Sequence, residues 1–230
     1  MAGSSASATP RAEGTWTAGE RVHCWQCGAA HAPDYFCPAC GNIQPLPEQV
    51  DYFRVMGLPQ RLVVDLADLQ RRYYDLHRQL HPDRFQTSAQ SARVASLRNT
   101  ATVNRAFSTL RDPIDRGLYW LALQGESVGT NNNRVPPDLA AVVFETQEQL
   151  EELRAARATP AADGLAAALR DTRNDLEARR AALLDRLQTN FTAWDAGGEA
   201  AGLTRELKTL LSDLAYLGTL LRDLDKELER

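Results

Sequence analysis

The sequence predicts an all-α fold that follows a small cysteine-rich segment, and three observations carry this prediction. From Asp51 onward, apolar residues recur at three- and four-residue steps, the spacing that places them on one face of a helix. The last helical stretch carries leucines in an unbroken 4-3 spacing over almost four heptads, which is typical of a packed seam. No stretch shows strand-like alternation of comparable strength.

The composition is that of an ordinary globular protein. The chain has 230 residues, of which 43% are hydrophobic and 24% are charged. At this length we expect one large domain or two modest ones with a buried core. No apolar run approaches the ~20 residues that a membrane span requires, so the sequence predicts no transmembrane helix.

The formal net charge of −4 averages over opposed parts of the chain. Residues 1–50 carry −2, residues 51–123 carry +4 from eleven arginines against seven aspartates, and residues 124–230 carry −6. This asymmetry favours two surfaces for two partners, although ordinary solvated faces would give the same charges.

Residues 1–22 are small, polar and without periodicity, and we expect them to be a disordered leader. They contain no apolar stretch of the kind that a secretory signal needs. Serine, threonine, alanine and two arginines are compatible with an organelle transit peptide, but Glu13 and Glu20 count against one.

Residues 23–47 hold all four cysteines as two C-x-x-C pairs: Cys24, Cys27, Cys37 and Cys40. A tight turn brings residues three apart together, and the glycine after each pair, Gly28 or Gly41, allows the turn to close. Four thiolates at ~2.3 Å around one ion form a closed tetrahedral zinc site, which is structural and not catalytic. The apolar side chains of the segment are too few to fold it without a metal.

Other interpretations of the four cysteines remain open. Two disulfides need an oxidising compartment, and the chain shows no secretion signal. A redox C-x-x-C pair belongs on a strand–helix turn, which the sequence does not predict here. An iron–sulfur cluster can use the same ligands, but zinc suits their spacing and closed number best. His23 and His31 lie nearby, and we expect both to be exposed loop residues, not ligands.

Four helices are predicted in residues 51–123. A short apolar helix ends at Gly57, and a basic helix begins after Asp65 as its N-cap and ends before Pro82. A third helix fills Ser88–Arg111, and a fourth follows it. The expected core residues of the second and third helices are Leu66, Leu69, Tyr73, Leu76, Leu80, Val94, Leu97, Val103, Phe107 and Leu110.

Residues 124–137 form a linker rich in glycine, asparagine and proline, and they mark a domain boundary. Three helices are expected beyond it, at roughly 138–158, 161–195 and 199–229, which form a three-helix bundle over residues 138–230. The seam of the last helix consists of Leu203, Leu207, Leu210, Leu214, Leu217, Leu221, Leu224 and Leu228.

The tripeptide His81-Pro82-Asp83 follows the basic helix and precedes Arg84-Phe85 and another long helix. The tripeptide alone is a weak signal, but its place in this order of helices is specific. Together with Asp51-Tyr52-Phe53 and Asn104-Arg105-Ala106-Phe107, it makes residues 51–123 resemble a J domain, the module that stimulates the ATPase of DnaK-type heat-shock chaperones. The resemblance is closest to HscB-type co-chaperones of iron–sulfur cluster assembly. The bundle also fits that family, as does the four-cysteine extension, which some of its members have and others lack.

The resemblance implies contacts with an HscA- or DnaK-type chaperone. Pro82 pre-organises the turn, Asp83 can accept a charge-assisted hydrogen bond from an arginine, and His81 can donate or accept near neutral pH. A basic strip would steer the domain toward an acidic patch on the chaperone, and it consists of Arg71, Arg72, Arg78 and Arg84. His81 and Asp83 have no accompanying nucleophile, so we expect a protein that is not an enzyme.

The resemblance also implies that the bundle binds an IscU-type iron–sulfur scaffold protein through an apolar and acidic patch. In this sequence the patch falls on Phe144, Glu145, Glu148 and Tyr216. Phe144 lies off the core stripe of its helix, which consists of Leu139, Val143, Thr146, Leu150 and Leu153. Two positions depart from the family: Ala140 replaces a large apolar residue, for which Leu139 or Val143 can substitute, and Ala215 replaces a basic one.

We therefore expect a co-chaperone that delivers the scaffold to the chaperone and stimulates its ATPase, in the bacterial cytoplasm or, alternatively, in the mitochondrial matrix. A general J-domain co-chaperone with another client or a dimerising bundle would show the same division of charge. A zinc-ribbon protein that binds nucleic acid would need basic residues around the cysteines, but residues 24–40 contain no lysine or arginine. We expect neither a nucleic acid nor a membrane as partner.

Overall fold

The structure is a computed structural model that describes residues 21–47, 49–129, 139–156 and 159–229. Most of the predicted leader lies outside the described residues, and so does the second half of the predicted linker.

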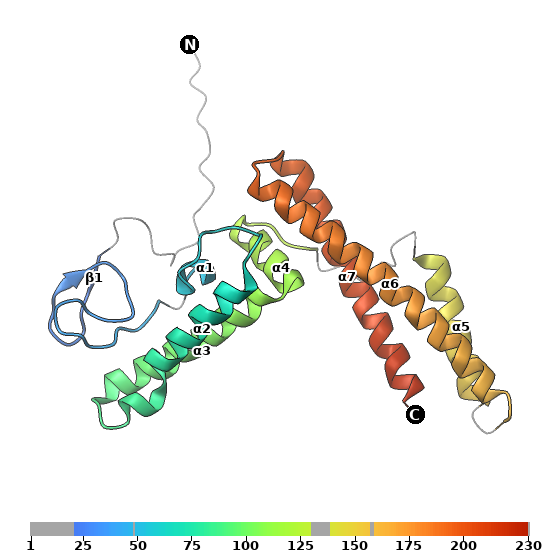
Figure 1. The fold of residues 1–230 in the computed structure, drawn as a ribbon, viewed down its shortest axis with the longest axis horizontal. Helices are drawn as coiled ribbons and strands as arrows, with labels where there is room; N and C mark the ends of the chain where they lie inside the picture. The colour runs from blue at the N-terminus through green and yellow to red at the C-terminus, as the bar shows by residue number, and fades with distance from the viewer. Residues whose placement is uncertain (1–20, 48, 130–138, 157–158, 230) are drawn as a thin grey trace, which may run out of the picture. The chain divides into compact units, whose positions relative to one another are not determined.

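The described chain is built almost wholly from helices, which confirms the predicted all-α class (Figure 1). It divides into two compact units, one with residues 1–60 and 64–111 and the other with residues 61–63 and 112–230. Among the described helices, none combines the length and the apolarity that crossing a membrane requires.

The first unit begins with the four-cysteine segment and continues into a helical hairpin. Its strands β1 (Val22–His23) and β2 (Ala30–His31) pair antiparallel, with Val22 opposite His31. The elements that follow are α1 (Tyr52–Val55), α2 (Leu66–Leu80), the 3-10 turn η1 (Pro82–Phe85) and α3 (Gln90–Arg111). Helices α2 and α3 lie side by side and are joined through η1 (Figure 1).

The helix boundaries of this unit follow the predicted signals. The Asp65 carboxylate accepts hydrogen bonds from two backbone amides in the first turn of α2, at 2.9 and 3.2 Å. Gly57 has a φ of +63° directly beyond α1, a conformation that glycine adopts without strain. Helix α2 ends at Leu80, because Pro82 disfavours helical geometry at His81.

The face that α3 buries differs from the predicted one. Val94 and Leu97, which were expected in the core, are 45% and 58% exposed. The buried face instead carries Ala92, Ala95, Ser96, Asn99, Thr102, Val103, Ala106 and Leu110. These residues also follow three- and four-residue steps, but a search for large apolar residues overlooks small and polar ones. Leu66 of α2 is exposed as well, so the core stripe of that helix starts at Leu69.

The second unit consists of α4 (Pro113–Leu123), α5 (Ala140–Ala156), α6 (Ala162–Asp195) and α7 (Ala200–Leu228). Helices α6 and α7 run along each other, and α5 packs against both (Figure 1). The predicted leucine seam of α7 is confirmed, because its central members are buried: Leu207, Leu210, Leu214, Leu217, Leu221 and Leu224. The two end leucines, Leu203 and Leu228, are half-buried.

Helix α4 groups with the second unit, although the sequence-based division placed it with residues 51–123. A Cβ atom added to Gly117 would lie 3.2 Å from the side chain of Leu211, so α4 approaches α7 closely at this glycine. Trp120 meets Trp194 of α6 edge-on, with ring centroids 5.8 Å apart. Close helix approach and aromatic packing therefore hold α4 on α6 and α7. The other domain boundaries stay predictions.

Candidate functional site

The His81-Pro82-Asp83 turn closes the hairpin of α2 and α3. The Nδ1 atom of His81 accepts a hydrogen bond from the backbone N–H of Asp83 at 3.3 Å, and the Asp83 carboxylate lies 3.5 Å from the same nitrogen. Gln86 donates its side-chain amide to that carboxylate at 3.1 Å. The Asp83 side chain is nevertheless 72% exposed. The turn therefore presents a histidine and a carboxylate in a fixed arrangement at the surface.

Two hydroxyl groups of α3 fix the end of α2 directly before this turn. Ser96 Oγ donates to the carbonyl oxygen of Leu80 at 2.6 Å, and Thr100 Oγ1 donates to the same oxygen at 3.1 Å. The last carbonyl groups of a helix have no intrahelical partner, so these donors satisfy one of them. Arg84 satisfies another, because its Nη1 donates to the carbonyl oxygen of Arg78 at 3.3 Å. Helix α3 thus sets the position of the turn.

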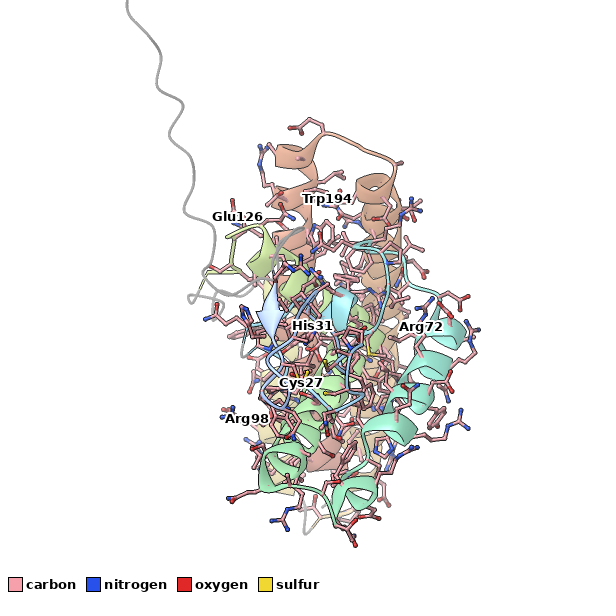
Figure 2. The ribbon with its side chains drawn as sticks, turned by 90° about the vertical axis from the view of Figure 1, so that its left-hand side faces the viewer. Cys27, His31, Arg72, Arg98, Glu126 and Trp194 are labelled. Carbon is pink, nitrogen blue, oxygen red and sulfur yellow. The ribbon has the colours of Figure 1, made fainter. Side chains whose placement is uncertain are left out.

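Three of the four arginines in the predicted basic strip form ion pairs within α2. The pairs are Arg71–Asp68, Arg72–Asp68 and Arg78–Asp75. The hydrogen bond from Arg72 is the main cause that holds the pKa of Asp68 below its usual value. Arg72, labelled in Figure 2, also donates to the carbonyl oxygen of Gly57 at 2.7 Å, so it helps to hold α1 and α2 together. The side chains of Arg71 and Arg78 are largely exposed and present their positive charge to solvent.

A shallow groove beside the turn brings in residues that the sequence-based prediction missed. It is lined by Pro82, Asp83, Gln86, Arg93 and Leu97. Exposed apolar surface next to charged groups is typical of protein-binding sites. The spacing of Arg93 and Leu97 on one helix face is visible in the sequence, but only the fold shows that they border Pro82.

The four cysteine sulfurs converge on one point. Their Sγ atoms all lie within 4.8 Å of one another, with Cys24 and Cys40 at 3.6 Å and Cys27 and Cys37 at 3.8 Å. A tetrahedron with metal–sulfur bonds of ~2.3 Å has edges of about 3.8 Å, so this spacing fits one tetrahedral ion. A disulfide would need sulfurs about 2.05 Å apart, and all four cysteines are free thiols. The cluster can therefore hold a single metal ion.

Hydrogen bonds around Cys24 favour its ionised form. Its Sγ accepts from the backbone N–H of Gln26 at 3.3 Å and of Cys27 at 3.5 Å, and from the side-chain amide of Gln44 at 3.3 Å. Desolvation opposes ionisation, but the backbone hydrogen bonds together with those from the side chains of Cys40 and Cys27 outweigh it and lower the pKa of Cys24 to about 6. A thiol must lose its proton to ligate a metal, so this environment suits a metal ligand.

The glycine after each cysteine pair has the predicted conformation. Of the two histidines nearby, one is exposed as expected and the other is not. Gly28 and Gly41 have φ values of +74° and +71°. His23 is exposed, as predicted. His31, by contrast, is buried, and its Nδ1 donates to the carbonyl oxygen of Ala32 at 2.7 Å. The pairing of β2 with β1 places His31 opposite Val22, and this two-residue ribbon is too short to show in a pattern search.

The predicted scaffold-binding residues divide into two groups. Phe144 on α5 is 67% exposed, and Glu145 and Glu148 on the same helix are exposed beside it. Tyr216 on α7 is half-buried and packs against the apolar cluster of the bundle. Burial raises the pKa of its hydroxyl. Leu139, a possible substitute for the apolar residue before Phe144, is buried.

Comparisons with known proteins point to one family. No protein-family model matches the chain. Over 129 residues, 56% of this chain, it is 32% identical to a protein of Arabidopsis thaliana named iron-sulfur cluster co-chaperone protein HscB homolog. That match covers 51% of the Arabidopsis protein, so this chain spans about half the length of its curated relative.

Two solved structures are similar in fold. The crystal structure of human co-chaperone protein HscB matches with a TM-score of 0.67 and 26% identity, over 89% of this chain and 98% of the human one. Chaperone HscB from Vibrio cholerae matches with a TM-score of 0.56 and 25% identity, over 76% of this chain and 96% of that one.

Proposed function

We propose that the chain, which resembles HscB proteins in sequence and fold, is a co-chaperone of iron–sulfur cluster assembly. It binds an IscU-type scaffold protein through its bundle, presents the scaffold to an HscA- or DnaK-type chaperone, and stimulates the ATPase of that chaperone. In this role it performs no covalent step itself. We assign it to the bacterial cytoplasm, with the mitochondrial matrix as the second candidate compartment.

The geometry of the His81-Pro82-Asp83 turn carries the proposal. Hydrogen bonds from Ser96 and Thr100 hold the base of the turn, while the carboxylate of Asp83 is accessible. Because the turn is already ordered, an arginine of a partner can bind the carboxylate with little loss of conformational freedom. The exposed arginines of α2 add positive charge that steers toward an acidic surface.

The test is stimulation of ATP hydrolysis by a cognate chaperone. We expect the wild-type chain to accelerate hydrolysis, and His81→Gln and Asp83→Asn to abolish the acceleration without loss of helical content. Asp115→Asn is the matched control, because Asp115 is an exposed aspartate of the second unit. Equal stimulation by wild type and His81→Gln would refute the proposal.

Binding of the scaffold protein is tested by a separate pull-down. Phe144→Ala should weaken capture of the scaffold, whereas Leu118→Ala, at an exposed apolar residue of α4, should not. Tyr216 packs on the core and Ala140 is small, so two positions of the expected scaffold-binding patch offer little surface to a scaffold protein. The alternative is therefore a general J-domain co-chaperone with another client or a dimerising bundle. Undiminished capture by Phe144→Ala with intact ATPase stimulation would favour it.

We also propose that the four cysteines hold Zn²⁺ as a structural ion. The spacing of the four sulfurs supports this assignment, because thiolates fill all four tetrahedral positions and leave none open for chemistry. When bound, the ion cross-links the two C-x-x-C turns and stabilises the segment. Metal analysis of the purified chain should find zinc in equimolar amount, whereas iron together with visible absorption would reveal a cluster instead.

A further inference from the structure

The side chain of Asn99, on α3, is fully buried and hydrogen bonded to the four-cysteine segment. Its Nδ2 donates to the carbonyl oxygen of Gln44 at 2.8 Å, and its Oδ1 accepts from the backbone N–H of Leu46 at 2.9 Å. The amide thus pairs with an extended backbone as a neighbouring strand would. A buried amide needs its partners, so displacement of residues 44–46 would leave Asn99 unsatisfied.

Gln44 connects this contact to the cluster of sulfurs. Its side chain is buried, and its Nε2 donates to Cys24 Sγ at 3.3 Å. The same nitrogen also lies 2.9 Å from the carbonyl oxygen of Asn42 and 3.1 Å from that of Ile43, so its two hydrogens are shared among three acceptors. A thiolate that binds a metal is a fixed acceptor, and hydrogen bonds to metal ligands orient both partners. Metal binding at Cys24 should therefore reduce the conformational freedom of the Gln44 side chain.

Trp25 lies beside α3 at a second place where the segment borders that helix. It directly follows Cys24, and its Nε1 donates to the carbonyl oxygen of Ile43 at 2.6 Å. Trp25 lines a surface groove together with Val94 and Arg98 of α3. The residue that directly follows the ligand Cys24 therefore borders α3.

The same turn of α3 also holds the end of α2. Asn99 lies between Ser96 and Thr100, the two residues whose hydroxyl groups donate to the carbonyl oxygen of Leu80. One helical turn thus contacts the four-cysteine segment and also the residue that precedes His81.

We propose that Gln44 and Asn99 form a hydrogen-bonded link through which metal binding at the four cysteines stabilises the turn of α3 that positions His81. The link rests on the proposed zinc site but does not depend on the chaperone role. Through this link, the metal-bound four-cysteine segment would stabilise the hairpin of α2 and α3 as well as itself. Without the metal, Asn99 loses its ordered partner, and local opening of residues 96–100 becomes easier.

Backbone amide hydrogen exchange of the full chain, with and without Zn²⁺, tests the link. In the wild type, removal of Zn²⁺ with a chelator should speed exchange in residues 95–103 about tenfold, roughly the effect of one buried hydrogen bond. In Asn99→Ala, this difference should shrink to about twofold while the metal stays bound. Asn104→Ala is the matched control, because Asn104 also lies on α3 but bonds to the hydroxyl of Tyr73. It should keep the full difference.

A second variant covers the case in which Asn99→Ala fails to fold. Gln44→Leu keeps the backbone carbonyl that Asn99 contacts but removes the donor to Cys24, so it should also reduce the metal dependence. Uptake is followed with Co²⁺, whose thiolate absorption reports binding. If the wild type takes up neither Zn²⁺ nor Co²⁺, the zinc site and the link are both overturned. If metal binds but exchange in residues 95–103 is unchanged, or if both variants keep the full difference, the link alone is overturned.

Discussion

The ring of Tyr73 on α2 stacks on the ring of Phe107 on α3, with centroids 4.2 Å apart and planes inclined by 20°. The Tyr73 hydroxyl donates to Asn104 Oδ1 at 3.2 Å, so the tyrosine is held at both ends. This stack holds α2 and α3 together at a distance from the His81-Pro82-Asp83 turn. The hydroxyl groups of Ser96 and Thr100 hold the two helices together next to the turn.

Removal of one ring should therefore loosen the hairpin. Phe107→Ala is expected to lower the free energy of unfolding by about 2 kcal/mol, because it removes stacked and half-buried apolar surface. Tyr74→Ala, at an exposed neighbour of Tyr73, should change it by no more than about 0.5 kcal/mol. Urea unfolding followed by circular dichroism measures both, and equal effects would show that the stack contributes nothing.

Substitution of Arg72 should affect stability, whereas substitution of Arg78 should affect the rate of association with the chaperone. Arg72→Ala removes the hydrogen bond to Gly57 and should lower the free energy of unfolding by about 1 kcal/mol. Arg78→Ala should leave stability unchanged but slow association with the chaperone, most of all at low salt. Unfolding curves and association rates at two salt concentrations distinguish them, and identical behaviour of the two variants would contradict this division.

The stability contributed by Asp68 should depend on pH. The fold holds the pKa of Asp68 below its ordinary value of 3.8, chiefly through the hydrogen bond from Arg72. The charged carboxylate therefore stabilises the native state above that ordinary value, and its contribution disappears as the pH falls through the lowered pKa. Asp68→Asn should be less stable than wild type at neutral pH and should converge with it in acid. A difference that is the same at every pH would contradict this assignment.

Phe144 and Tyr216 should respond differently to truncation, although both were predicted to bind the scaffold. Phe144→Ala should change the free energy of unfolding by less than about 0.5 kcal/mol, because its side chain is exposed. Tyr216→Ala should lower it by about 1–2 kcal/mol, because Tyr216 packs on the bundle core. Thermal unfolding alongside the pull-down measures both effects. Loss of scaffold binding in a fully stable Tyr216→Ala would place that residue in the binding patch instead.

Features that depend only on residues close in the sequence could be predicted from the sequence. The cap at Asp65, the stop at Gly57 and the helix end before Pro82 depend only on neighbouring residues, and each lies where the pattern predicted it. Each C-x-x-C turn is also local, so the fold has only to bring the two turns together for the four cysteines to meet.

Features that depend on contacts between distant parts of the chain could not be predicted from the sequence. The buried face of α3 carries Ser96, Asn99 and Thr102, which look like solvent-facing residues until their partners are known. Val94 and Leu97 look like core residues but lie on the outer face beside grooves. Packing of α4 on α7 depends on the close approach at Gly117, which a hydrophobic pattern does not record.

The buried amide of Asn99 also sets an evolutionary constraint. A buried asparagine is costly unless its amide is hydrogen bonded, and here the backbone of residues 44–46 supplies the partners. A lineage that lost the four cysteines would lose the reason to keep asparagine at this position. Among proteins similar to this chain, asparagine at this position and the cysteine extension should therefore be inherited together, and chains without the extension should carry an apolar residue in its place.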